Sequence, residues 1–345
     1  MKTSAIRRTL WEVNAALLPG IAAMTWFYGI GILINLVTCV AVAIMSEAFV
    51  LILRRRSLTT LFDGSTIMTG LLIALCLSPF IPLLLLISGV AIAIVFGKHL
   101  FGGLGHNPFN PAMVGYAVLI LSFPTQMTLW PSLAEMGIND VDINPGLTVE
   151  ETVTIKQRLT LQEIIAFKTF EPIPDAVTMA TPLDQMKFRG SLTTTEVWET
   201  TRGFGSVAGT GWEVINLCFL IGGIFLLLRR HIDWRVPLAM LLTIAIVTGL
   251  FYDSGSSESI GSPFFHLFSG GTMLTAFFIA TDPVTTPVSS LGRWLFAIGV
   301  GLLAVIIRFH GAYPDGMAFA ILMMNAATPL LDHWVTKRQR PVATT

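Results

Sequence analysis

The chain has 345 residues, of which 53% are hydrophobic and only 12% are charged. Soluble domains carry roughly 25% charged residues, so this composition argues against an ordinary soluble protein and predicts an all-α integral membrane protein. Lys and Arg equal Asp and Glu at 21 each, and no basic stripe appears, so nothing supports nucleic-acid binding.

Apolar stretches that could cross a bilayer recur along the chain, where one helical span takes about 20 residues. The first stretch, 15–53, is too long for one span, and we divide it near Asn35. The ten predicted spans are approximately 15–35, 35–53, 66–78, 83–97, 111–130, 214–228, 236–252, 264–281, 294–307 and 316–334. They define a first membrane half, 1–130, a loop region, 131–211, and a second membrane half, 212–345.

Basic residues are unevenly distributed between the segments that join these spans. With a cytosolic N-terminus, fourteen of the 21 basic residues fall in cytosolic segments and only Arg308 falls in a short outer loop. The remaining six lie in 131–211, and long loops are exempt from the positive-inside rule. We therefore expect both termini in the cytosol and 131–211 outside. The fourteen are Lys2, Arg7, Arg8, Arg54, Arg55, Arg56, Lys98, Arg229, Arg230, Arg235, Arg293, Lys337, Arg338 and Arg340.

The two membrane halves share a pattern of small residues. The Gly-Ser-Thr at 64–66 is echoed by Gly-Gly-Thr at 270–272, and Gly105 and Pro108 are echoed by Gly311 and Pro314 at the same offset. Five spans in each half make the halves an inverted 5+5 repeat. Short, Gly-interrupted spans at matching positions of such repeats usually mark the central binding site of a transport fold. Chance similarity between Gly- and Thr-rich helices is the alternative.

The loop region contains one helix signal and one run of hydroxyl residues. Thr160-Leu161-Gln162-Glu163 is a capping box before an apolar run, which predicts a small ordered domain. In Asp175-Ala176-Val177-Thr178-Met179-Ala180-Thr181-Pro182, the hydroxyls suit a turn that bonds local backbone. Pro182 disfavours a helical conformation at Thr181 and predicts an extended one, which would present its hydroxyl.

Three polar residues in or beside the spans leave two interpretations each. Asn110 precedes Pro111 and suits a helix cap, with Asn107 in a turn, yet both amides could face a ligand where the halves meet. Glu47 lies inside the second span, where a carboxylate is costly. It either pairs with a basic residue or marks an ion path. The three Cys and six His lack metal-ligand spacing, so we expect no metal site.

Five segments of the chain together resemble the RnfD (RsxD) family, the D subunits of the Rnf ion-translocating electron-transport complex. They are LLPGIAAMTWFYG, GGLGHNPFNPAMVGYAVLI, DAVTMATPLD, SGGTMLTAFFIATDPVT and GAYPDGMAFAILMMNAATPLLD. The chain is more distantly similar to the B component of the Na⁺-translocating NADH:quinone reductase. The resemblance extends over almost the entire chain.

This resemblance implies covalent FMN, esterified through its phosphate to Thr181 by a separate flavin transferase, with Asp175 and Thr178 as parts of the acceptor motif. It also implies a non-covalent riboflavin near the cytosolic side, beside Asn107, Asn110 and Asp282. Four aromatic residues of the loop region could pack on the flavin ring, and the sequence does not distinguish among them: Phe167, Phe170, Phe188 and Trp198.

The implied function is an electron-transfer step, in a bacterial inner membrane, that couples ferredoxin- and NAD-linked redox chemistry to Na⁺ or H⁺ movement. The implied partners are the iron–sulfur, NAD-binding and second covalent-flavin subunits of the complex, together with membrane lipid. The rival is a plain solute transporter or channel, because fold does not fix function. A transporter has no need of the acceptor motif in an ordered outer domain.

Overall fold

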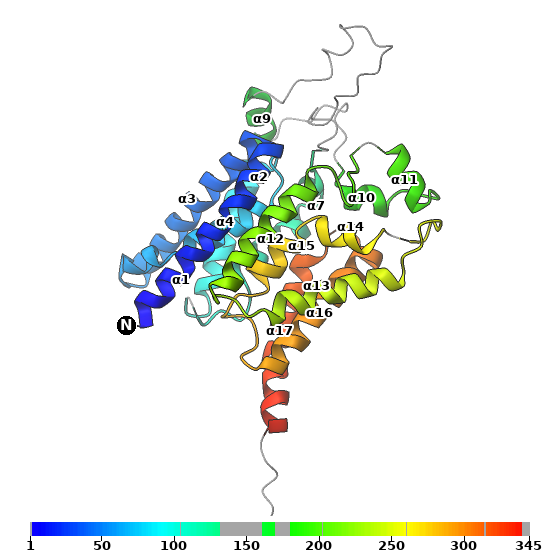
Figure 1. Cartoon of the computed structure of the whole chain (residues 1–345). Helices are drawn as coiled ribbons and strands as arrows, with labels where there is room; N and C mark the ends of the chain where they lie inside the picture. The colour runs from blue at the N-terminus through cyan, green and yellow to red at the C-terminus, as the bar shows by residue number, and fades with distance from the viewer. Residues whose placement is uncertain are drawn as a thin grey trace, which may run out of the picture.

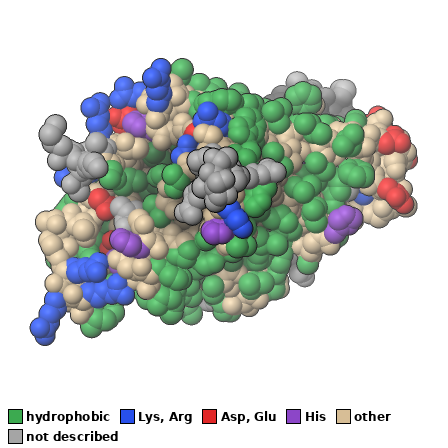
Figure 2. Space-filling model, turned by 90° about the horizontal axis from the view of Figure 1, so that it is seen from below, with side chains coloured by type: hydrophobic (Ala, Val, Ile, Leu, Met, Phe, Trp, Pro, Cys, Tyr) green, Lys and Arg blue, Asp and Glu red, His purple; other side chains and the backbone are tan. Residues whose placement is uncertain are grey.

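The computed structural model describes residues 2–103, 105–131, 161–169, 180–201, 203–259, 261–313 and 315–339. In these ranges the chain is helical and contains no strand. Helices α9, α10 and α11 lie at one end of the molecule, which we call the loop end (Figure 1). The N-terminus and the C-terminal end of α17 lie at the opposite end, the termini end. Viewed from the termini end, several groups of Lys and Arg side chains stand beside an extensive hydrophobic surface (Figure 2).

The first half is built from short apolar helices around α3. Its elements are α1 (Lys2–Ala16), α2 (Leu18–Tyr28), α3 (Ile30–Leu53), η1 (Leu58–Asp63), α4 (Ser65–Cys76), α5 (Leu83–Ile92), the π-helix η2 (Ala93–His99), α6 (Pro111–Ser122) and α7 (Pro124–Thr128). The loop region contributes α9 (Leu161–Lys168), α10 (Pro182–Lys187) and α11 (Thr194–Thr200). Helix α9 begins where the sequence predicts a helix, although Thr160 lies outside the described residues.

The second half repeats this mixture of long and interrupted helices. Its elements are α12 (Trp212–Leu228), α13 (Arg235–Leu250), α14 (Pro263–Phe268), α15 (Thr272–Leu274), the π-helix η3 (Thr275–Ile279), α16 (Ser290–His310) and α17 (Met317–Gln339). Among the described residues, only α3 and α16 are long and apolar enough to cross a membrane by themselves. The helical class is therefore confirmed, while ten spans in an inverted repeat stay a prediction.

The predicted division of the first apolar stretch near Asn35 is wrong. The helix breaks at Gly29, whose φ of 70° lies in the left-handed region that glycine adopts without strain. Asn35 lies inside α3, where its Nδ2 donates to the Ser78 carbonyl oxygen at 2.9 Å. This bond explains how a polar side chain is fully buried in an apolar helix, because it satisfies a carbonyl just beyond α4.

The two halves pack through helices at corresponding places in each. Helix α2, within the first predicted span of the first half, packs on α12, the first predicted span of the second half. Helix α6, within the fifth predicted span, packs on α17, which covers most of the tenth. A glycine permits the first of these contacts: a Cβ on Gly20 of α2 would lie 2.1 Å from Phe219 Cε1 on α12. Close approach at small residues is the usual way in which membrane helices gain packing.

Candidate functional site

Thr181 forms the first turn of α10 together with Asp184. Its Oγ1 donates to Asp184 Oδ2 at 2.6 Å and accepts from the Asp184 N–H at 3.2 Å. The Thr181 N–H donates to the same carboxylate oxygen at 2.9 Å, which completes a capping box. Thr181 itself is extended, with φ −69° and ψ 159°, and Pro182 follows it. The predicted extended conformation is confirmed, whereas Asp175 and Thr178 lie outside the described residues.

Helix α10 is held firmly against the second half. Leu183 and Met186 are buried in a cluster with Val197, Ala208 and Phe265. From the same helix, Lys187 Nζ donates to carbonyl oxygens in the last turn of α16 and just beyond it, at 3.4 Å for Ile307 and 3.2 Å for Tyr313. A cation at a helix C-terminus satisfies carbonyls that have no partner within the helix. Thr181 is thus part of the packed structure and does not stand on a separate loop.

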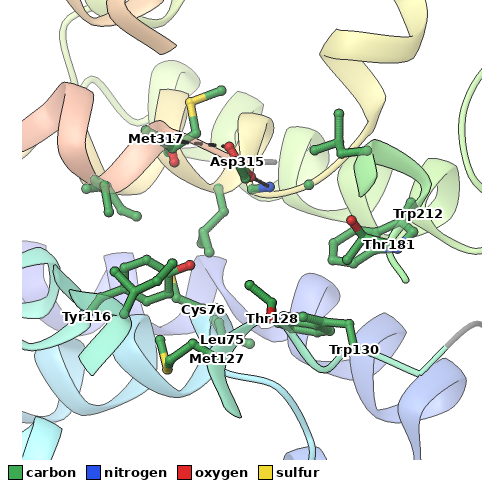
Figure 3. Close-up of a pocket in the computed structure, with 18 of the residues that line it drawn as sticks. Leu75, Cys76, Tyr116, Met127, Thr128, Trp130, Thr181, Trp212, Asp315 and Met317 are labelled. Atoms are coloured by element: carbon green, nitrogen blue, oxygen red, sulfur yellow. Dashed lines mark hydrogen bonds between the residues drawn. The ribbon is translucent and has the colours of Figure 1, made fainter. Parts of the chain in front are cut away.

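Thr181 and Asp184 line a cavity of about 100 Å³ between the two halves at the loop end (Figure 3). A single water needs roughly 10 to 15 Å³ by this measure, so the cavity has room for a polyatomic group. Cys76, Tyr116 and Trp130 line it from the first half. Trp212, Gly270, Gly271, Thr275, Asp315 and Met317 line it from the second.

Two tryptophans form an aromatic wall of this cavity. The rings of Trp130 and Trp212 lie 5.6 Å apart, and both contact Tyr28, at 5.5 Å and 5.9 Å. The sequence reasoning missed them, although they are the last residue of the first half and the first residue of the second.

The aromatic residues that the sequence suggested for ring packing lie elsewhere. Phe188 is 66% exposed, and Trp198 packs on Phe204 and Phe265; neither lines the cavity. Phe170 lies outside the described residues, as does the side chain of Phe167. The packing of Phe188 and Trp198 on a flavin stays a prediction.

Two carboxylates face the cavity in different environments. Burial raises the pKa of Asp184 above its ordinary value, and the hydrogen bonds from Thr181 only partly oppose this. Asp315 Oδ2 accepts from the Gly271 N–H at 2.9 Å, and its Oδ1 lies 3.2 Å from Arg308 Nη2. Arg308 is fully buried, so the carboxylate of Asp315 forms an ion pair with a buried cation.

Asn110 and Asp282 meet between the two halves. Asn110 Oδ1 caps α6 by accepting from Ala112 N at 3.1 Å and Met113 N at 3.3 Å, so the predicted cap is confirmed. Its Nδ2 lies 3.4 Å from Asp282 Oδ2, which joins the two halves. Asn107 donates to the Phe109 carbonyl oxygen at 3.0 Å, while its Oδ1 is buried and has no partner in the part of the chain described.

Glu47 belongs to a third, separate cluster. It is 2% exposed, and its Oε2 accepts from Lys98 Nζ at 2.6 Å. Thr66 Oγ1 also donates to this carboxylate, and His99 Nε2 lies 3.4 Å from its Oε1. The pairing with a basic residue is therefore present, and a role in an ion path stays a prediction.

The chain matches one known protein family over nearly its whole length. A family described as NQR2, RnfD, RnfE matches residues 1–340. The chain belongs to the NQR2, RnfD, RnfE family. The resemblance to RnfD inferred from the sequence motifs is thereby confirmed.

Curated members of the NQR2, RnfD, RnfE family match nearly the full chain. A protein of Pseudomonas paraeruginosa is 45% identical over 339 residues, covering 98% of this chain and 92% of its own. A protein of Sodalis glossinidius is 43% identical over 333 residues, covering 96% and 94%. One of Salmonella paratyphi A is 41% identical over 337 residues, covering 96% and 93%. All three are named as the D subunit of an ion-translocating oxidoreductase complex.

Proposed function

We propose that this chain is the membrane subunit of an ion-translocating oxidoreductase complex and carries FMN as a phosphoester on Thr181. The observation that carries the proposal is the position of Thr181. Its hydroxyl lies on a cavity between the two halves, with tryptophans from both halves in the wall. A flavin bound there would supply electron transfer, the chemistry that the names of the relatives imply.

The residues around Thr181 suit a tethered flavin. A hydroxyl supplies the oxygen of the ester, and Trp130 and Trp212 offer apolar faces on which a planar ring can pack. Tyr116, Thr128 and Thr275 add hydroxyl groups to the lining. Since α10 is fixed by buried contacts, the ester oxygen would keep its position relative to the cavity.

Two pairs of matching arrangements support an inverted repeat across the membrane. Lys98 Nζ lies 3.1 Å from Thr66 Oγ1, and Arg308 Nη2 lies 2.9 Å from Thr272 Oγ1. Thr66 and Thr272 are corresponding residues of the two halves, and each buried cation follows the fourth span of its half. The packing of α2 on α12 and of α6 on α17 fits the same symmetry.

A non-covalent riboflavin near Asn107, Asn110 and Asp282 is a second part of the proposal. The buried Oδ1 of Asn107 offers an acceptor that no described residue uses. Asn110 has fewer polar atoms free to bind a flavin, because its Oδ1 already caps α6 and its Nδ2 donates to Asp282. The remaining electron carriers, iron–sulfur clusters, an NAD site and a second covalent flavin, would belong to partner subunits.

Peptide mass spectrometry tests the proposal directly. The chain is expressed with a flavin transferase, and the tryptic peptide 169–187 is analysed. We expect an FMN-sized mass increase in the wild type and in Thr178→Val, and none in Thr181→Val. A wild-type peptide without the increase would overturn the proposal. The Thr181→Val change removes a helix cap, at a cost of about 1 kcal/mol, so the variant should still fold.

The same preparation separates this proposal from a plain solute transporter. After denaturation, covalent flavin should remain as in-gel fluorescence of the wild-type band and be absent from Thr181→Val. A transporter without redox function would show no fluorescence in either band. Loss of electron transfer in an assembled complex that contains Thr181→Val would establish that the flavin lies on the electron path.

A further inference from the structure

We propose that Asp184 is the proton acceptor that activates the Thr181 hydroxyl when the flavin phosphoester is formed. This inference rests on the proposed function and adds a catalytic residue supplied by the acceptor chain itself. The contact that carries it is the 2.6 Å hydrogen bond from Thr181 Oγ1 to Asp184 Oδ2. The hydroxyl proton that must leave is already directed at the carboxylate oxygen.

The chemistry requires such an acceptor. An ester between a hydroxyl and a phosphate needs an activated phosphorus donor, and a flavin dinucleotide supplies one in its phosphoanhydride. Attack by Thr181 Oγ1 on the flavin-bearing phosphorus forms the O–P bond and breaks the P–O bond of the anhydride. The nucleoside monophosphate leaves with the electron pair, and the hydroxyl proton passes to Asp184. No oxidation or reduction occurs. A positioned general base contributes typically about 10²- to 10⁴-fold to such a step.

The surroundings of Asp184 distinguish it from a residue that only caps a helix. It lines the cavity together with Thr181 and Asp315, and burial raises its pKa, which makes the carboxylate a stronger base than an exposed aspartate. The neighbouring negative charge of Asp315 acts in the same direction. A second capping box in the chain provides the comparison. Thr193 Oγ1 donates to Glu196 Oε2 at 2.9 Å on α11, and that pair does not line the cavity.

The test uses the full chain, purified from cells without flavin transferase, so that Thr181 is unmodified. Purified transferase and FAD are added, and covalent flavin is followed by in-gel fluorescence over time and across pH. We expect Asp184→Asn to load about 10²-fold or more slowly than the wild type, as expected for loss of a general base, while Asp184→Glu recovers a substantial part of the rate. Glu196→Gln, which alters the matched capping box, should load at the wild-type rate.

The pH profile separates a base from a cap. The wild-type rate should fall on the acid side, at a pH above the ordinary aspartate pKa, as Asp184 takes up its proton; Asp184→Asn should lack this limb. Wild-type loading rates in Asp184→Asn, or an equal slowing in Asp184→Asn and Asp184→Glu with an unchanged pH profile, would overturn the inference alone. A wild-type chain that does not load, with a transferase active on another acceptor, would overturn the proposed function as well.

Discussion

Asn14 and Asn216 make the same kind of hydrogen bond in the two halves of the molecule. Asn14 Nδ2 donates to the Gly64 carbonyl oxygen at 3.0 Å, and Asn216 Nδ2 donates to the Gly270 carbonyl oxygen at 3.2 Å. Gly64 and Gly270 are corresponding residues that precede the interrupted helices α4 and α15, and both have positive φ. Each asparagine therefore fixes the start of a helix that is too short to span the molecule.

The two asparagines should differ in their contribution to stability. Asn216 also donates to the Phe268 carbonyl oxygen at 2.9 Å, and its Oδ1 accepts from Met273 N at 3.2 Å. Asn14 Oδ1 has no partner among the described residues. Because each buried group left without a partner costs about 1–3 kcal/mol, Asn216→Ala should lower the thermal unfolding temperature in detergent more than Asn14→Ala. Equal losses would contradict the assignment of the additional bonds.

The Glu47–Lys98 pair should be costly to break from one side only. Both side chains are 2% exposed, so Glu47→Gln or Lys98→Met alone leaves an uncompensated buried charge, at a cost of about 3–5 kcal/mol. The double variant should recover much of this loss. Arg8→Met is the control, because Arg8 is 74% exposed in its pair with Glu12 and should cost less than about 1 kcal/mol. A double variant less stable than both single variants would contradict simple pairing. If the double variant is stable and the complex that contains it still transports ions, the Glu47–Lys98 pair is not part of the ion path.

Asn110 can be tested for its two roles separately. Asn110→Ser keeps a hydroxyl that can cap α6, so its stability should stay near that of the wild type, whereas Asn110→Ala should lose about 1 kcal/mol. If the amide also binds flavin, Asn110→Ser should release less non-covalent flavin after acid extraction. Unchanged flavin content in both variants would leave capping as the role of this residue.

Burial lowers the pKa of Lys168 from 10.5 to about 8. Its Nζ donates to Asn35 Oδ1 at 2.6 Å and attaches α9 to α3. Because the folded pKa is lower, the unfolded chain binds more protons between about pH 8 and 10.5, and stability should rise with pH through this window. Unfolding temperatures of the wild type and Lys168→Met, compared at about pH 7.5 and about pH 9.5, measure this effect. The difference between them should favour the wild type more at the higher pH; a constant difference would contradict the lowered pKa.

Membrane topology can be tested with single cysteines. Glu199 on α11 lies at the loop end, and Arg54 and Lys337 lie toward the termini end; all three are exposed. With the native cysteines replaced, a membrane-impermeant thiol reagent on intact cells should label Glu199→Cys but not Arg54→Cys or Lys337→Cys. The opposite result would reverse the orientation without changing the fold.

The sequence predicts the helices of this chain better than their ends. Apolar runs locate the helical segments, because buried helices need long apolar stretches. Gly64 and Gly270 mark where two short helices begin, because both positions have positive φ, which glycine adopts without strain. The break at Gly29 is hidden inside one continuous apolar run, so composition cannot place it. The misplacement at Asn35 follows from treating a buried amide as a boundary, when its partner is a carbonyl 43 residues away.

The same distinction applies to the candidate site, where the sequence predicts local features but not contacts between the two halves. The extended conformation of Thr181 and the cap at Asn110 depend on neighbouring residues, so the sequence is sufficient to predict them. Thr181-Pro182-Leu183-Asp184 is also a readable capping box, and it was a missed local signal. The contact of Trp130 with Trp212 depends on how the two halves pack, as does the pair of Asp315 with Arg308. No local pattern contains that information.

The π-helical segments restrict how the chain length can change. In η2 the Leu100 N–H bonds to the Val95 carbonyl oxygen at 2.9 Å, so this stretch holds one residue more than an α-helix over the same turn. Removing that residue would turn the side chains on one side of the deletion by about 100° relative to those on the other. Lys98 would then no longer face Glu47. Insertions and deletions in this family member should therefore be excluded from Ala93–His99.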